Sequence, residues 1–90
     1  MIDTLNIRGL KETLRKFDED GLSAHGIHWS MGKGGYDLDW ELYYDSVPVV
    51  DCICGEISNI GLSEKLFKRI AKIILEEYNT NPYKPLKIKC

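Results

Sequence analysis

The chain has 90 residues, of which 43% are hydrophobic and 29% charged, and its net charge is −2. This composition is typical of a globular protein and excludes a disordered chain, and the length predicts a single domain over residues 1–90. No apolar run is long enough to span a membrane, and the N-terminus has neither the basic nor the apolar region of a secretion signal. The three cysteines have no disulfide-framework spacing, so we expect a cytoplasmic protein with reduced thiols.

Charge is segregated along the chain. Residues 35–63 carry six acidic residues and no Lys or Arg, whereas residues 64–90 carry seven basic residues and three acidic ones. Such segregation bears on the choice of partners more than on the fold, because surface charge steers association and disfavours partners of like sign.

The first predicted element is a helix. Apolar residues recur at helical spacing from Ile7 to Phe17, with charged residues between them. Asp3 and Asn6 are candidate caps for its start, and Gly21 suits the position just past its end.

Residues 36–44 alternate strictly and predict a β-strand with one aromatic face and one acidic face. The inward set is Tyr36, Leu38, Trp40, Leu42 and Tyr44, and the outward set is Asp37, Asp39, Glu41 and Tyr43. This strand has the clearest pattern in the sequence, and we expect it to form the centre of a sheet.

A shorter alternation at residues 27–31 predicts the strand that pairs with it, and the glycine-rich sequence between the two supplies a tight hairpin turn. Pairing the last residue of this strand with Tyr36 matches the two apolar faces. It also places His28 on the outward face opposite Asp39 or, after a shift of two residues, opposite Asp37.

After a turn at residues 45–46, residues 47–57 predict a third strand with an ambiguous phase. One register buries Ile53 but also Asp51, whereas the other buries both nearby cysteines and leaves Ile53 outside. In either register apolar side chains remain on the outward face. We therefore expect another strand, the C-terminal tail or a second subunit to cover part of it, and we predict a homodimer.

Ser63 is the predicted cap of a second helix, whose apolar stripe runs from Leu66 to Tyr78. Residues 79–90 predict either a flexible basic tail or a short edge strand. The expected fold is α+β, with the order α-β-β-β-α. Two helices cover one face of a three-stranded antiparallel meander, to which the tail could add a short fourth strand.

Candidate chemistry is sparse. His25, His28, Cys52 and Cys54 are ligand types that suit zinc, but the two histidines point to opposite faces and Cys-x-Cys lacks the usual gap. A cysteine–histidine–aspartate arrangement also fails, because the first and third strands of a meander lie about 9–10 Å apart. We expect no cofactor, no metal site and no enzymatic activity.

The acidic sheet face is the strongest functional candidate. A line of carboxylates on a stiff strand can dock into a basic groove, and the predicted contact residues are Asp37, Asp39, Glu41, Asp45 and Asp51. The chain resembles small acidic phage proteins that inhibit CRISPR nucleases in its size, charge pattern and helix–sheet–helix layout. That likeness implies a protein partner with a basic surface, such as a nucleic-acid-processing enzyme.

The alternative is a nucleic-acid-binding module. The element order resembles that of double-stranded-RNA-binding domains, which also place lysines at the start of their second helix, although the Gly-Pro-x-His loop of that family has no counterpart here. The residues that would contact phosphates are Lys65, Lys68, Arg69, Lys72, Lys84, Lys87 and Lys89.

Overall fold

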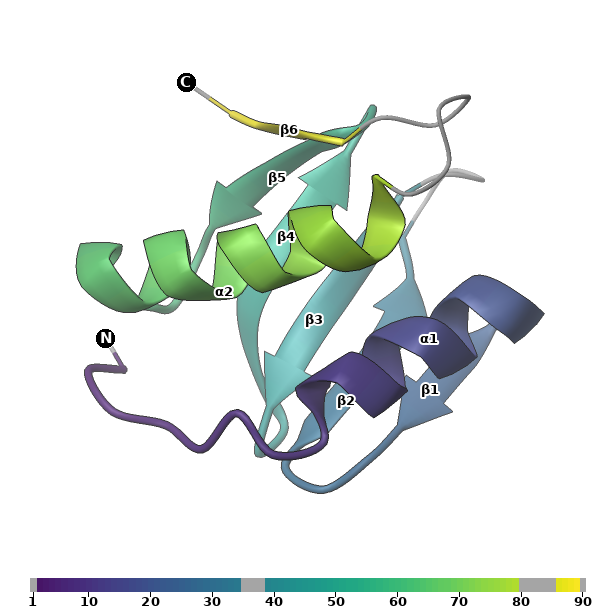
Figure 1. The fold of residues 1–90 in the computed structure, drawn as a ribbon, viewed down its shortest axis with the longest axis horizontal. Coiled ribbons are helices and arrows are strands. Elements are labelled where there is room, and N and C mark those ends of the chain that lie inside the picture. Colours follow the sequence, from purple (N-terminus) through teal and green to yellow (C-terminus); the bar gives the residue numbers. More distant parts are fainter. Residues whose placement is uncertain (1, 35–38, 80–85, 90) are drawn as a thin grey trace.

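The structure is a computed structural model that describes residues 2–34, 39–79 and 86–89. Over these ranges, two helices pack against one face of a six-stranded sheet (Figure 1). The elements in chain order are α1 (Leu10–Asp20), β1 (Ser23–His25), β2 (Trp29–Lys33), β3 (Trp40–Tyr44), β4 (Val47–Ile53), β5 (Glu56–Asn59), α2 (Glu64–Tyr78) and β6 (Lys87–Ile88).

The strands lie side by side in the order β1-β2-β3-β4-β5-β6. Each pair is antiparallel except β5 and β6, which are parallel because α2 carries the chain back across the sheet between them. The α+β class and the placement of both helices on one face are confirmed. The predicted meander is too small, because the short strand β1 and the division of the third strand into β4 and β5 were not predicted, whereas β6 is the possible fourth strand that was expected.

The first helix begins later than predicted. Gly9 precedes it in the left-handed conformation, at φ 89°, and no side chain caps the helix, so the prediction that Asp3 or Asn6 caps it is wrong. Gly9 also touches a neighbouring loop so closely that a Cβ atom there would lie 2.6 Å from the carbonyl oxygen of Ile27. The predicted end is confirmed: Gly21 has φ 67° and donates its N–H to the carbonyl of Phe17.

The register of the β2–β3 hairpin differs from the prediction. Met31 pairs with Leu42 rather than with Tyr36, a shift of six residues, and Trp29 pairs with Tyr44. Residues 35–38 lie outside the described ranges. An even shift leaves every side chain on its predicted face, and so the alternation could not distinguish the two registers. The observed register brings the rings of Trp29 and Tyr44 to a centroid distance of 4.9 Å.

The predicted third strand is in fact a hairpin. β4 and β5 are joined by Cys54 and Gly55, whose φ angles of 53° and 79° fit a tight turn of type I′. A β-bulge also interrupts the ladder between β3 and β4, since Leu42 pairs with Val50 while the next residue pairs with Pro48. The bulge buries two consecutive valines, and this explains why neither simple phase fitted the sequence.

The second helix and the tail follow the prediction more closely. The Ser63 hydroxyl accepts a hydrogen bond from the N–H of Leu66 and caps α2. Of the tail, residues 87–88 form the parallel edge strand β6, whereas residues 80–85 lie outside the described ranges. No helix in the described parts of the chain is long and apolar enough to cross a membrane.

The core lies between the helices and the inner face of the sheet. Trp40 is 6% exposed and packs edge-on between Phe17 of α1 and Tyr78 of α2, and Leu42 beside it is fully buried. The burial predicted for Trp40 and Leu42 is therefore confirmed, whereas Leu38 lies outside the described ranges. A bidentate pair between Arg15 and Glu77 holds the two helices together above this core.

Because Trp40 contacts both helices, Trp40→Ala should lower the free energy of unfolding by about 3–5 kcal/mol, measured by urea denaturation. The matched control is Ile53→Ala on the opposite face, where Ile53 is 54% exposed and the loss should be below about 0.5 kcal/mol. Equal losses in the two variants would contradict this arrangement of the core.

Candidate functional site

The outer face of the sheet is the side opposite the two helices (Figure 1). Its residues alternate with the buried ones along each strand, and most of them are small or polar, with Ile53 as an apolar exception. They include Ser30, Gly32, Glu41, Tyr43, Asp51 and Ser58, all of intermediate exposure. Within the described ranges, no helix packs on this face.

Two carboxylates face each other at the centre of this surface. Glu41 on β3 pairs directly with Asp51 on β4, so like charges occupy opposite positions of the ladder. Glu41 accepts a hydrogen bond of 2.6 Å from the Tyr43 hydroxyl, and this bond raises the pKa of Tyr43. The Oδ1 atom of Asp51 is buried and has no hydrogen-bond partner among the described residues. The pair thus places two like charges opposite each other and leaves one oxygen of Asp51 without a hydrogen-bond partner among the described residues.

Asp39 does not belong to this exposed surface, contrary to the prediction. It is only 8% exposed, and its Oδ1 accepts a hydrogen bond of 3.1 Å from the backbone N–H of Cys54. The carboxylate therefore stabilises the β4–β5 turn. This role was not visible in the sequence, because the turn itself was not predicted.

Asp45 lies at one end of the face, in the turn between β3 and β4. Its carboxylate is 2.9 Å from Nδ1 of His28, whose ring stacks on Tyr44. The predicted pairing of His28 with Asp39 or Asp37 is therefore wrong. The six-residue shift in the β2–β3 register places His28 beside this turn instead. Asp37 lies outside the described ranges.

Glu56 was not among the predicted contact residues. It is exposed on β5 and pairs with Ile53, two residues beyond Asp51 on the same face of β4. The sequence assigned both residues to one continuous strand, and so their proximity across a hairpin was not expected.

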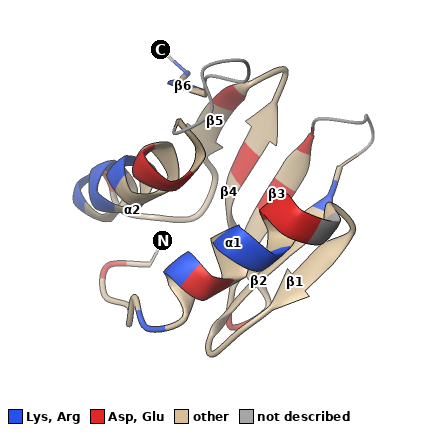
Figure 2. Cartoon of the chain, turned by 45° about the vertical axis from the view of Figure 1, so that its right-hand side comes forward, with Lys and Arg blue, Asp and Glu red and all other residues tan. Residues whose placement is uncertain are grey.

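Acidic residues lie on both sides of the molecule. Figure 2 shows Asp and Glu along β3, β4 and β5 and also on both helices, where most of the Lys and Arg positions fall as well. The predicted basic residues of α2 are all exposed, as are those of the tail that the structure describes. These residues are Lys65, Lys68, Arg69, Lys72, Lys87 and Lys89, whereas Lys84 lies outside the described ranges.

The cysteines and histidines do not converge. Cys52 faces the core, and burial raises the pKa of its thiol to about 11, which makes it a poor nucleophile at neutral pH. Cys54 is exposed in the β4–β5 turn, and His25 is exposed on β1 at the far edge of the sheet. Among the described residues, no group of three or more His, Cys, Asp or Glu is placed to hold a metal ion.

A scan of the chain against models of known protein families finds no match, and searches of curated proteins and of solved structures find no significant match either. The element order on which the likeness to double-stranded-RNA-binding domains rests also differs, because five strands rather than three separate α1 from α2.

Proposed function

We propose that this chain is a non-enzymatic binding protein whose outer sheet face docks a basic surface of a protein partner. The surface consists of Glu41, Asp51 and Glu56, with Asp45 at its end. The observation that carries the proposal is the direct opposition of Glu41 and Asp51 on a face that no helix of the described chain covers. Like charges opposite each other destabilise a sheet, and local rules of stability are broken most often at functional sites.

The position of Asp51 beside Glu41 supports the same function. A lysine or arginine of a partner would neutralise the repulsion between these two carboxylates. A rigid sheet also costs little conformational entropy on binding, since its backbone is already ordered. The face therefore suits a partner that presents positive charge on a broad surface.

The most concrete form of this function is inhibition of a nucleic-acid-processing enzyme, in the manner of small acidic phage inhibitors. Such an enzyme offers a basic groove that binds phosphates, and carboxylates on a stiff scaffold can occupy the same groove. In this form the protein acts in the cytoplasm, where the enzyme and its substrate meet.

A second candidate function is nucleic-acid binding through α2. Lys65, Lys68, Arg69 and Lys72 are all exposed, and only Lys68 forms an ion pair among the described residues. Glu64 and Glu76 share the exposed side of the helix with them and would repel a phosphate chain. We therefore place this function second.

The double variant Glu41→Lys/Asp51→Lys should lose its partner while keeping its fold, because both side chains point away from the core. Removing paired charges at an interface costs on the order of 2–5 kcal/mol of binding energy. Wild-type and variant proteins would be used to capture partners from a host extract, with identification by mass spectrometry and circular dichroism to check folding.

The matched control is Lys65→Glu/Lys72→Glu, which should capture the same partner as the wild type. A mobility assay with duplex DNA and RNA at low salt tests the second candidate. Tight nucleic-acid binding that the Lys65→Glu/Lys72→Glu variant loses, together with unchanged capture by the Glu41→Lys/Asp51→Lys variant, would overturn the acidic-face proposal.

Self-association is a separate part of the proposal. Val47 and Ile53 on β4 are 47% and 54% exposed, and an uncovered apolar position on a sheet favours contact with a second copy. Sedimentation equilibrium at micromolar concentration should therefore show a homodimer. A single species at the monomer mass of 10.3 kDa would contradict it.

A further inference from the structure

The two edges of the sheet differ in charge. β6 at one edge carries Lys87, with Lys89 directly after it, and charged side chains are a common protection of an edge strand against pairing with another chain. The other edge is β1, and residues 21–32 contain no Lys, Arg, Asp, Glu or Pro. Figure 2 shows β1 as the outermost strand at the right, with α1 in front of the sheet rather than beside this edge.

Four backbone groups of β1 point away from the sheet. A hydrogen bond of 2.8 Å from the Gly26 N–H to the Trp29 carbonyl fixes the alternation of the β1–β2 ladder. In an antiparallel ladder Ala24 then also bonds to β2, while Ser23 and His25 direct their N–H and C=O groups toward the edge. No hydrogen bond among the described residues uses these four groups. The edge therefore carries two donors and two acceptors that a further strand can satisfy.

The spacing of these groups fits a second copy of β1 in antiparallel orientation. With a two-fold axis at Ala24, Ser23 of each copy pairs with His25 of the other, which makes four backbone hydrogen bonds. A longer extended peptide would find only three residues of strand to pair with. A second β1 has the same length and ends at the same points, so it leaves no part of either strand unpaired.

Exposed apolar side chains flank β1 at both ends. Leu22 directly precedes the strand and is 72% exposed, and Ile27 follows it and is 47% exposed. In the pairing centred on Ala24, Leu22 lies across from the Gly26 of the other copy, which has no side chain, and close to that copy's Ile27. Burial of these side chains adds an apolar contribution, which is needed because each new hydrogen bond replaces one to water.

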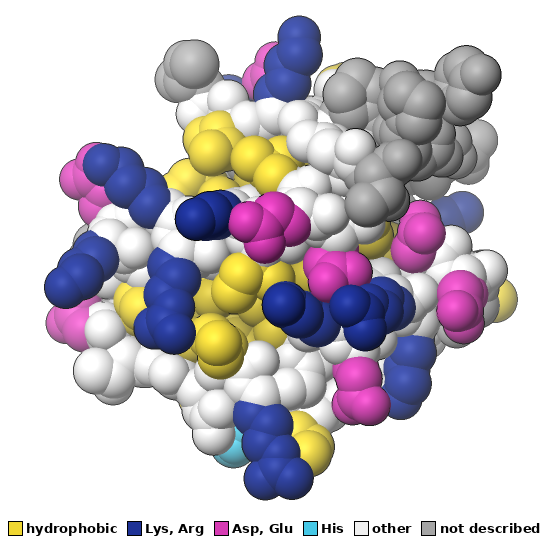
Figure 3. All heavy atoms as spheres, viewed as in Figure 1, with side chains coloured by type: hydrophobic (Ala, Val, Ile, Leu, Met, Phe, Trp, Pro, Cys, Tyr) yellow, Lys and Arg dark blue, Asp and Glu magenta, His cyan; other side chains and the backbone are white. Residues whose placement is uncertain are grey.

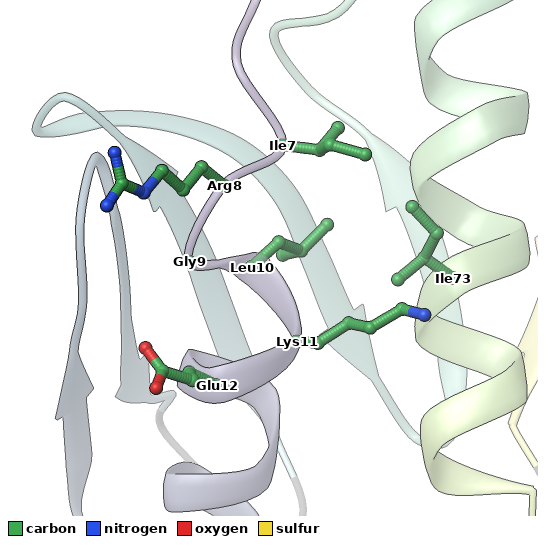
Figure 4. Close-up of a pocket in the computed structure, with 7 residues that line it drawn as sticks. All are labelled: Ile7, Arg8, Gly9, Leu10, Lys11, Glu12 and Ile73. Atoms are coloured by element: carbon green, nitrogen blue, oxygen red, sulfur yellow. The ribbon is translucent and has the colours of Figure 1, made fainter.

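The charges of α1 are complementary in the same arrangement. α1 begins beside Ile27 and ends directly before Leu22, so the end of each α1 approaches the start of the other. The end carries the exposed acids Asp18 and Glu19. The start has the positive end of the helix dipole and Arg8, which points away from α2 (Figure 4). A second copy thus supplies the charge that each end of α1 favours.

Other charges on the helical side select no different partner. Glu12 also points away from α2 (Figure 4), and the exposed Lys16 one helical turn later offsets its charge. Figure 3 shows Lys, Arg, Asp and Glu side chains together over the helical surface, around a limited apolar area. The groove between α1 and α2 has Lys11 and Glu12 on its rim and Leu10, only 1% exposed, at its floor. The β1 edge is the surface at which apolar exposure, backbone groups and charge agree on one occupant.

We propose that two copies of the chain pair antiparallel through β1, centred on Ala24, and join their sheets into one. This contact rests on the self-association proposed above and gives it an interface, at the β1 edge rather than at Val47 and Ile53. The outer faces of the two copies then lie on the same side of the joined sheet. The acidic face is not part of the contact, and its binding of a partner is a separate question.

Amide hydrogen exchange, followed by NMR, tests the pairing residue by residue. The Ala24 amide bonds to β2 and serves as the internal control, because it is protected whether or not a second copy binds. The His25 amide is protected only when the edge is paired. Its exchange should be at least about tenfold slower in the wild type than in Ser23→Lys at the same protein concentration, while that of Ala24 stays the same.

Two substitutions at Ser23 should dissociate the dimer. Ser23→Lys gives β1 the kind of charge that protects β6, and Ser23→Pro removes an outward N–H without breaking a bond to β2. Each should raise the dimer dissociation constant by at least about tenfold in sedimentation equilibrium, with circular dichroism to check folding. Ser58→Lys, on the outer face of β5, is the matched control and should leave the dimer unchanged.

Three results would overturn the edge contact. A dimer that persists in Ser23→Lys but dissociates in Ile53→Lys would keep the self-association and move its interface to β4. Rapid exchange of the His25 amide in a dimeric sample would show that β1 is unpaired. A wild-type protein that stays monomeric would overturn the self-association together with the edge contact, and it would leave the acidic-face proposal untouched.

Discussion

Two helices can cover only one face of the sheet, and this constraint organises the whole molecule. The helices bury the aromatic and aliphatic side chains of the inner face, with Trp40 in contact with both of them. The outer face must then be stable in water, and small or polar residues occupy most of it. That requirement explains serine, glycine and tyrosine on this face, but it does not explain two carboxylates placed directly opposite each other.

The helical side is organised by the N-terminal segment. Because Trp29 and Tyr44 hold Asn6, residues before α1 are ordered by the sheet rather than by the helix itself. This attachment places Ile7 opposite Ile73 and leaves Lys11 without a carboxylate partner among the described residues. The molecule thus presents Glu41, Asp51 and Glu56 on the outer face of the sheet, whereas its helical side carries both acidic and basic residues.

Patterns in the sequence predicted which side of each element is buried, but they did not predict how the strands pair. Alternation showed which side of β3 is buried, and the Ser63 cap located the start of α2, because both signals are local. The strand register was not predicted, since an even shift preserves every face. A bulge and a two-residue turn at Cys54 concealed the β4–β5 hairpin, and three residues of β1 are too few to show a period. Of the predicted acidic site, Glu41 and Asp51 lie on the outer face, whereas Asp39 is buried because it stabilises that unpredicted turn.

The central claim is that the outer face keeps opposed carboxylates for binding, at a cost in stability. A double-mutant cycle with Glu41→Gln and Asp51→Asn, measured by urea unfolding at low and high salt, tests it most directly. We expect the wild-type pair to show a repulsive coupling of about 0.2–1 kcal/mol at low salt that weakens as salt is added. An attractive coupling, or a marked loss of stability in Asp51→Asn alone, would mean that the carboxylates stabilise the fold and would contradict this account.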